Sequence, residues 1–370
     1  MSRQGRKLLF TPGPLNCPDE VRAAMYLDVG SREPAFIECV ATIRQLLLET
    51  AGLSSESDWC SVPMQGSGTF AIESALTTLI KKSDKLLVLE NGAYGERMVT
   101  IARRAGLPVV RDQVSPTDTH DPQHVAEILA NDPDISHVAM VHCETTTGIL
   151  NPIATLASTV KNAGRTVIVD AMSSFGALPL GLDSGDIDCV AASANKCLEG
   201  APGCAFVILR QNLLEQAAGN CPSLSLDLHA QWEELERTGQ FRFTPPTHVV
   251  LALRQALELL RREGGPTARR SRYQENHATL LRHMKPLGFE PVLPLALQSE
   301  IITAFPYPAA EAFDFDRFCQ RLEERDLIIY PGKLSNLPCF RIGTIGDISP
   351  ADVERLVREI ETVLKEMGLR

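Results

Sequence analysis

TVIVDAMSSFGALPLGLDSGDIDCVAASANKCLEGAPG, residues 166–203, holds two strand-like apolar runs and the turn that leads into a third. The first run, 166–171, is short and rich in β-branched residues, which is typical of a strand buried on both faces of a parallel sheet. The second run, 187–194, follows a connection that contains Ser, Gly and Pro. Gly200–Gly203 then turns into the apolar run 204–209. The pattern predicts strand, loop, strand, turn and strand.

Asp170 and Lys196 come at the ends of the first two runs. Ligands of open α/β sheets lie beyond the carboxyl ends of the strands, so we expect both residues to share one crevice. This pairing suits pyridoxal phosphate, which needs a lysine to hold its aldehyde as a Schiff base and a carboxylate to keep its ring nitrogen protonated. The alternative is structural: Asp170 caps a helix and Lys196 is a solvated loop lysine.

Length and charge narrow the class of protein. The chain has 370 residues, more than the roughly 250 residues of a typical single core, so we expect one large domain and a smaller one. Its hydrophobic content is an ordinary 44%, and no apolar run reaches the roughly 20 residues that span a bilayer. A net charge of -10 argues against nucleic-acid binding, which needs a basic stripe. We therefore expect neither membrane insertion nor a nucleic-acid partner.

The ten cysteines are scattered, form no close-spaced CxxC pair and follow no amino-terminal signal segment. We therefore expect reduced thiols in a cytoplasmic protein. Several cysteines lie inside apolar runs, where a free cysteine usually acts as a small core residue. We assign no metal site.

Strand-like runs at about 85, 107, 137, 166, 187 and 204 are mostly separated by helical patterns, which predicts an α/β fold with a mostly parallel central sheet. After residue 300, short strands alternate with helices, as in a smaller C-terminal α+β domain. Glu263–Pro266 is the clearest boundary signal. We predict an N-terminal arm (1–20), a large α/β domain (21–264) and a small α+β domain (265–370).

A second cofactor signal is the glycine-rich turn Gln65–Thr69, which precedes apolar residues at helical spacing. The free amides and the dipole at such a helix start bind phosphate, and Ser67 and Thr69 add hydroxyl donors. The alternative is an ordinary turn. The phosphate interpretation gains weight because Asp170 and Lys196 indicate a phosphate cofactor independently.

Four further residues are candidates for contacts with cofactor or substrate. Tyr94 follows a strand and is placed to stack on a flat ring, although an ordinary half-buried turn tyrosine has the same pattern. Thr145 is better placed to bond a ring substituent than His142, for which a satisfied core histidine is the commoner case. Arg341 lies in an apolar strand and serves either an internal salt bridge or an anionic substrate. Arg32 is either a substrate contact or a surface arginine.

On these residues the sequence closely resembles the 2-aminoethylphosphonate–pyruvate transaminases, which belong to the alanine–glyoxylate group of fold-type-I pyridoxal-phosphate aminotransferases. The resemblance runs nearly end to end. Its carriers are Phe-Thr-Pro-Gly-Pro-Leu (10–15), Gln-Gly-Ser-Gly (65–68), Asn-Gly-Ala-Tyr-Gly (91–95), Glu-Thr-Thr-Thr-Gly (144–148), Val-Asp-Ala-Met-Ser-Ser-Phe-Gly (169–176), Ser-Ala-Asn-Lys-Cys (193–197), Phe-Arg-Phe-Thr-Pro-Pro-Thr-His (241–248), Tyr-Pro-Gly-Lys (330–333) and Phe-Arg-Ile-Gly (340–343).

The resemblance implies a ping-pong transfer of the amino group of 2-aminoethylphosphonate to pyruvate, with pyridoxal 5'-phosphate as cofactor. It implies that Lys196 holds the cofactor covalently and that Asp170 pairs with the ring nitrogen. Tyr94 would stack on the ring, and Thr145 would contact its phenolic oxygen.

The resemblance also implies contacts at the two anionic ends of the site. Arg341 would bind the anionic end of the substrate. Thr244 would reach the cofactor phosphate from the neighbouring subunit, so the resemblance implies a homodimer. The other implied phosphate contacts are Ser67, Gly68, Thr69 and Asn195.

Residues 30–36, Gly-Ser-Arg-Glu-Pro-Ala-Phe, depart from the acidic, aromatic segment that the phosphonate enzymes often carry, and they are closer to the alanine–glyoxylate relatives. An alanine–glyoxylate or serine–pyruvate aminotransferase is therefore the alternative. A phosphate-ligand-binding protein without catalysis would keep the turn and the sheet, but it has no use for Lys196 opposite Asp170. Visible absorbance of the purified protein separates an enzyme of this kind from such a binding protein.

Overall fold

The computed structural model describes residues 6–54, 56–310, 312–332 and 337–369. Its largest sheet, within these residues, has the strand order β2-β10-β9-β8-β5-β3-β4. Strands β9, β8, β5, β3 and β4 pair in parallel, so the predicted mostly parallel α/β sheet is confirmed. The strands are β2 (Trp59–Gln65), β3 (Lys85–Glu90), β4 (Val109–Gln113), β5 (Ile135–Val141), β8 (Thr166–Asp170), β9 (Cys189–Ser193) and β10 (Cys204–Arg210).

Strand β10 runs antiparallel to both of its neighbours, β9 and β2. The connection from Ser193 to Cys204 carries no helix, and a parallel pair needs a crossover of about a dozen residues or more, usually helical. Strand β2 was not expected from the sequence because Pro63 interrupts its apolar run. β2 is an edge strand, where a residue without an N–H is tolerated.

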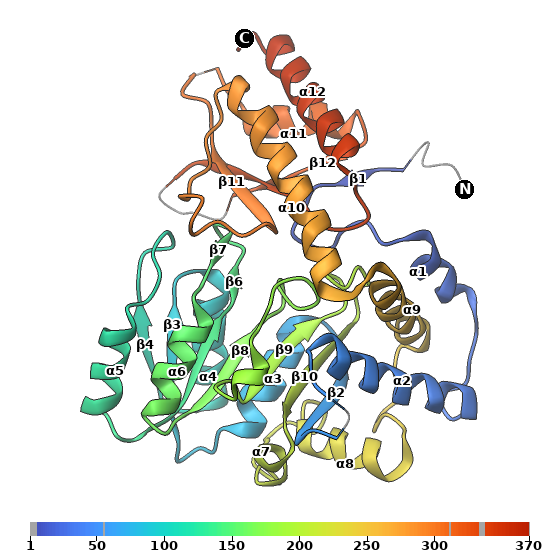
Figure 1. Ribbon diagram of the computed structural model, residues 1–370, viewed down its shortest axis with the longest axis vertical. Coiled ribbons are helices and arrows are strands. Elements are labelled where there is room, and N and C mark those ends of the chain that lie inside the picture. The colour runs from blue at the N-terminus through green and yellow to red at the C-terminus, as the bar shows by residue number, and fades with distance from the viewer. Residues whose placement is uncertain (1–5, 55, 311, 333–336, 370) are drawn as a thin grey trace.

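Helices alternate with these strands and cover the sheet (Figure 1). Asp121 caps α5 by accepting a hydrogen bond from the Gln123 amide, and Asp227 caps α8 through the Ala230 amide. The helices of this part are α1 (Asp19–Ala23), α2 (Pro34–Thr50), α3 (Gly68–Leu79), α4 (Ala93–Ala105), α5 (Pro122–Asn131), α6 (Ile153–Asn162), α7 (Gln211–Glu215), α8 (Leu228–Thr238) and α9 (Thr247–Glu263). A short hairpin of β6 (Cys143–Glu144) and β7 (Ile149–Leu150) follows β5.

The C-terminal part has its own sheet, of order β11-β14-β13, and its own apolar core. Helix α10 packs on both α9 and α12, and in Figure 1 it runs from the C-terminal part to the part that holds the large sheet. Ser349 and Asp352 form a capping box at the start of α12. The elements are α10 (Gly265–Met284), β11 (Ile302–Pro306), α11 (Phe315–Glu323), β12 (Leu327–Ile328), β13 (Tyr330–Pro331), β14 (Cys339–Gly343) and α12 (Pro350–Glu366).

The N-terminal arm packs into the apolar core of the C-terminal part. Its strand β1 (Leu8–Leu9) pairs in parallel with β12, and Phe10 is fully buried in the core of the C-terminal part. The domain limits 1–20, 21–264 and 265–370 stay predictions. Within the part of the chain that the structure describes, no helix combines the length and the apolar composition that crossing a membrane requires.

Candidate active site

A cavity lies at the carboxyl ends of β8 and β9, beside the start of α3. Asp170 is the last residue of β8, and Lys196 follows β9 by three residues. The sheet thus brings the acid and the amine to one cavity, as its strand directions require. The cavity is lined by Ser67, Gly68, Thr69, Ile72, Tyr94, Arg97, Asp170, Met172, Ser173, Ser193, Asn195 and Lys196.

The Lys196 amine lies against the N-terminal arm, where its Nζ donates a hydrogen bond to the carbonyl of Pro12 at 2.9 Å. Desolvation in this site lowers the pKa of Lys196, although Tyr94, Cys197 and Asp170 act in the opposite direction. A lowered pKa increases the fraction of the neutral amine near neutral pH. Lys196 is therefore prepared to act as a nucleophile or a base.

Asp170 is 5% exposed, and its Oδ1 accepts a hydrogen bond from the Met172 amide at 2.9 Å. Burial raises the pKa of Asp170 to about 6, against the opposing effects of the Met172 amide, Arg97 and Lys196. A buried carboxylate of this kind is stabilised by a cation placed in the cavity. The protonated ring nitrogen of a pyridine would supply such a cation.

The start of α3 presents its free amides to the same cavity. Ser67 is the N-cap residue, yet its side chain makes no capping hydrogen bond. The Thr69 hydroxyl oxygen accepts a hydrogen bond from Arg97 Nη1 at 3.0 Å, which leaves the Thr69 hydroxyl proton free to be donated. The helix start, two hydroxyl groups and a nearby guanidinium together favour an anion such as phosphate.

Arg97 and Glu144 are residues of this site that the sequence analysis missed. The Arg97 guanidinium carbon lies 4.8 Å from the centre of the Tyr94 ring, a cation–π distance. The buried Glu144 carboxylate accepts hydrogen bonds from the Tyr94 amide at 3.0 Å and from the Thr146 amide at 3.0 Å. Both residues hold Tyr94 in place. The spacing of three positions between Tyr94 and Arg97 on a helix was the available signal for Arg97.

Thr145 and Arg341 meet at the edge of the hairpin of β6 and β7. The Thr145 hydroxyl is buried and has no hydrogen-bond partner among the described residues. Arg341, in β14 and 2% exposed, donates from Nη1 to the Thr145 carbonyl at 2.6 Å and from Nε to the Pro331 carbonyl at 2.9 Å. Both of these partners are carbonyl groups, and no described carboxylate forms an ion pair with Arg341, which argues against the internal salt bridge. Desolvation lowers the pKa of Arg341.

Two of the predicted site residues, Arg32 and Thr244, do not line this cavity in the single chain. Arg32 is exposed in the turn before α2. Thr244 is exposed and lines a neighbouring groove together with Gly66 and Phe70. Their roles stay predictions. Lys333, the last residue of the motif at 330–333, lies outside the described residues.

His142 is fully buried, and its Nδ1 shares a hydrogen bond of 2.9 Å with the Ser174 hydroxyl. Burial lowers the pKa of His142 to about 4, which keeps the ring neutral near neutral pH. The structure therefore supports the alternative of a satisfied core histidine.

The residues present fit pyridoxal phosphate. An amine with a lowered pKa, a buried carboxylate without a cationic partner and a helix start with free donors surround one cavity. The unpaired hydroxyl of Thr145 adds a buried donor on the neighbouring hairpin. These groups correspond to the aldehyde, the ring nitrogen, the phosphate and the phenolic oxygen of that cofactor.

Comparison with known proteins gives close relatives. The family model "Aminotransferase class-V" matches residues 58–341. The 2-aminoethylphosphonate–pyruvate transaminase of Syntrophobacter fumaroxidans is 47% identical, covering 98% of this chain and 97% of the relative. That of Vibrio vulnificus is 48% identical, covering 96% and 97%. The crystal structure of an alanine–glyoxylate aminotransferase from Nostoc sp. has a TM-score of 0.90 at 24% identity, covering 97% of this chain and 95% of that chain, a likeness of fold.

Proposed function

The chain belongs to the class-V aminotransferases, and we propose that it transfers the amino group of 2-aminoethylphosphonate to pyruvate, giving phosphonoacetaldehyde and L-alanine. The structural observation that supports an aminotransferase reaction is that Lys196 and Asp170 line one cavity. The names of the near relatives support the phosphonate substrate. The alanine–glyoxylate alternative, which rests on residues 30–36, is not favoured, since the solved alanine–glyoxylate aminotransferase is 24% identical to this chain whereas the phosphonate relatives are 47% and 48% identical.

Pyridoxal phosphate, when bound, withdraws electrons from the carbon that carries the substrate nitrogen and stores the amino group between the two half-reactions. Lys196 would hold the cofactor aldehyde at rest. Its Nζ would also accept and return a proton at the substrate carbon, a role that requires the neutral amine that desolvation favours. Asp170 would hold the proton on the ring nitrogen, and Tyr94 would cover the ring face.

Arg341 supplies the recognition of the two substrates. Its guanidinium is a planar fork that pairs bidentately with a phosphonate or with a carboxylate. The carbonyl groups of Thr145 and Pro331 orient it without neutralising its charge. 2-Aminoethylphosphonate and pyruvate would therefore use one anion site in turn, as a ping-pong reaction requires.

We extend the proposal to a homodimer with shared sites. Thr244 and Phe70 line one groove next to Gly66, which precedes the phosphate-binding start of α3. Exposed large apolar side chains, which a second subunit would cover, are Tyr26, Leu27, Phe70, Leu224 and Phe243. We also propose a cytoplasmic location, which accords with ten free cysteines.

The test of substrate recognition is Arg341→Lys, with Arg270→Lys as the matched control. Arg270 is an arginine of α10 that pairs with Glu300 at 2.9 Å, so its replacement preserves the proposed anion site. We expect Arg341→Lys to raise KM for both 2-aminoethylphosphonate and pyruvate about tenfold or more, because a point charge replaces the fork. Steady-state kinetics with each substrate varied in turn measure this effect. Unchanged KM values for both substrates would remove Arg341 from its role.

Arg32→Ala tests the second anion contact in the same assay. A phosphonate carries more negative charge than a carboxylate, so we expect this substitution to raise KM for 2-aminoethylphosphonate more than KM for pyruvate. Equal and small effects on the two substrates would make Arg32 a surface arginine.

A further inference from the structure

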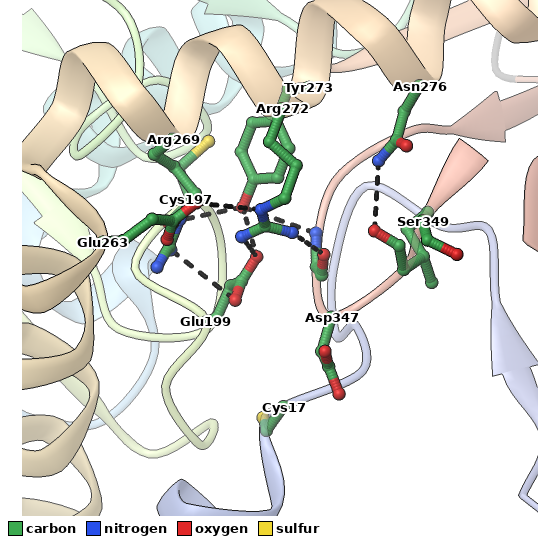
Figure 2. Close-up of polar contacts among 12 residues, drawn as sticks. Cys17, Cys197, Glu199, Glu263, Arg269, Arg272, Tyr273, Asn276, Asp347 and Ser349 are labelled. Atoms are coloured by element: carbon green, nitrogen blue, oxygen red, sulfur yellow. Dashed lines mark hydrogen bonds and ion pairs between the residues drawn. The ribbon is translucent and has the colours of Figure 1, made fainter. Parts of the chain in front are cut away.

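A largely buried cluster of charged residues contacts the turn that follows Lys196, and Figure 2 shows its side chains beside Cys197. The proposed reaction gives this cluster no role. It consists of Glu199 from the turn, Glu263 from the end of α9, and Arg269, Arg272 and Tyr273 from α10. We call these five residues the Glu199 cluster.

Every polar group of the Glu199 side chain is directed at α10. Its Oε1 accepts hydrogen bonds from the Tyr273 hydroxyl at 2.7 Å and from Arg272 Nη2 at 2.7 Å. Its Oε2 lies 3.7 Å from Arg269 Nη1. The Glu263 carboxylate accepts a hydrogen bond from Arg269 Nε at 2.6 Å and another from Arg272 Nε at 2.9 Å. Two acids balance two arginines, so the loss of one acid leaves a buried positive charge without its partner.

The cluster holds the backbone of the turn that begins at Lys196 at two points. Arg269 Nη1 donates to the carbonyl of Cys197, the residue after Lys196, at 2.6 Å. The Glu199 amide donates to the Lys196 carbonyl at 2.8 Å and closes the turn. Glu199 has a φ of 60°, in the left-handed region that residues other than glycine rarely occupy. The anchored carboxylate therefore holds an unfavourable backbone conformation three residues after the lysine.

The same cluster also contacts the loop that follows the strand of Arg341. Arg272 Nη1 donates to the Gly346 carbonyl at 2.7 Å, and the Gly346 amide donates to the Tyr273 hydroxyl at 3.4 Å. Gly346 follows the end of β14 by three residues. One set of side chains thus connects the turn of the proposed cofactor lysine with the part of the chain that carries the proposed substrate arginine.

We propose that Glu199 is a positioning residue, which fixes the turn after Lys196 through Arg272 and Tyr273 and thereby aims the lysine amine into the cavity. The proposal rests on Lys196 holding the cofactor. The ionisable groups that face the amine are Tyr94, Asp170, Cys143 and Cys197, and Glu199 is not one of them, although its charge contributes to the raised pKa of Cys197. A change in the titration of the lysine nitrogen that also occurs in Tyr273→Phe, which alters no charge, would report that the amine has moved relative to these groups.

The experiment compares Glu199→Gln with the wild-type protein, both loaded with pyridoxal phosphate. We expect the midpoint of the pH-dependent visible absorbance to move by about half a pH unit or more, and kcat to fall about tenfold, because small displacements of a reacting group are costly. KM for pyruvate should stay within about twofold, since Arg341 keeps its own contacts. In Glu199→Gly the glycine adopts the left-handed conformation without strain, but the carboxylate is lost. We therefore expect the absorbance midpoint and kcat of Glu199→Gly to change as they do in Glu199→Gln.

Asp188→Asn is the matched control. Asp188 is also a buried acid paired with a lysine and an arginine, Lys161 and Arg210, but it lies before the start of β9. We expect this variant to lose thermal stability while its absorbance midpoint and kcat stay at the wild-type values. Tyr273→Phe removes the hydroxyl, with its hydrogen bonds to Glu199, the Cys197 carbonyl and the Gly346 amide, but no charge, so it provides a milder test with a smaller shift in the same sense if Glu199→Gln does not fold.

Three results would overturn the proposal. The first is that those of the variants Glu199→Gln and Tyr273→Phe that fold have the absorbance midpoint and the kcat of the wild-type protein. The second is full recovery of both quantities in Glu199→Gly, which would show that the backbone conformation alone suffices. The third is an equal shift in the Asp188→Asn control. An absent visible band in the loaded wild-type protein would instead contradict the proposed function, so the two failures are distinguishable.

Discussion

At the residue scale, the environment of the cavity disfavours the charge of both Lys196 and Asp170. Desolvation lowers the pKa of Lys196 and raises the pKa of Asp170 to about 6. Each shift is useful for a different part of the reaction. The lysine must be neutral to react, while the acid gains its charge when a cationic ring nitrogen arrives as its partner.

The cofactor-free protein should therefore show a stability change that belongs to Asp170. Its pKa in the folded state is raised above the ordinary 3.8, so its contribution to the free energy of unfolding is present below pH 3.8 and is lost as the pH rises through about 6. The loss is on the order of 3 kcal/mol. We expect Asp170→Asn to lack this loss. Urea unfolding of both cofactor-free proteins at about pH 4.5 and about pH 8 measures it.

In the enzyme loaded with cofactor, the substitution Asp170→Asn should be harmful. There we propose that the Asp170 carboxylate pairs with the ring nitrogen, so Asp170→Asn should lower kcat by about a hundredfold or more. In the urea experiment, if the free energy of unfolding depended on pH in the same way for the wild-type protein and for Asp170→Asn, the pKa of Asp170 would not be raised in the folded state. A near-normal kcat of Asp170→Asn would make the acid structural.

Lys196 and Asp170 could be located from the sequence because each follows an apolar strand, and strand direction alone brings such ends together. Arg97 and Glu144 could not be selected in the same way. Glu144 holds the Tyr94 amide across fifty positions of sequence, a contact that no local pattern records. Glu199 could not be selected from the sequence either, since its partners on α10 lie more than seventy positions away.

At the scale of the elements, the N-terminal arm acts as one wall of the lysine site. Gly13 has a φ of 130°, and a Cβ added to it would lie 2.5 Å from Lys196 Cδ and 2.7 Å from Nζ. The lysine end is flexible, so we expect Gly13→Ala to displace the amine and to lower kcat about tenfold or more. Gly164→Ala is the matched control, with a φ of 73° and open space around the added Cβ. Kinetics and the thermal midpoint of each variant separate the two effects.

The arm's role would be disproved by equal kcat values for Gly13→Ala and Gly164→Ala. It would also be disproved if Gly13→Ala lost activity only in proportion to a loss of folded protein. Far-ultraviolet circular dichroism at the assay temperature provides that check.

Most helices and strands could be predicted within a few residues because their apolar periodicity is strong, as in α9 and α12. The direction of β10 was less evident, although the short connection from β9 leaves no room for a helical crossover. β2 was hidden by Pro63, whose presence an edge strand tolerates. The pairing of β1 with β12 joins segments more than three hundred positions apart, so only the folded chain reveals it.

At the scale of the whole molecule, a shared phosphate site can be tested by subunit mixing. Lys196→Ala and Thr244→Val would be purified separately, mixed in equal amounts and allowed to exchange subunits. If Thr244 serves the neighbouring subunit, each heterodimer contains one site with both wild-type residues. Half of the dimers are then heterodimers with one intact site of two, so about a quarter of all sites should be intact.

Lys196→Ala mixed with Asp170→Asn is the control for this experiment, because both residues line the cavity of one subunit. We expect no recovery in the control mixture. Recovery in neither mixture, after exchange is demonstrated by mass spectrometry, would contradict the shared site.

The central claim is that this aminotransferase takes 2-aminoethylphosphonate as its amino donor, and the most direct measurement is a single turnover of the pyridoxal form. Loss of its visible absorbance would be followed by stopped flow after mixing with 2-aminoethylphosphonate, alanine or serine. We expect rapid loss with the phosphonate, because we propose that Arg341 binds its anionic end, and slower loss with serine. Faster loss with serine than with 2-aminoethylphosphonate would contradict the claim and would favour a serine–pyruvate aminotransferase.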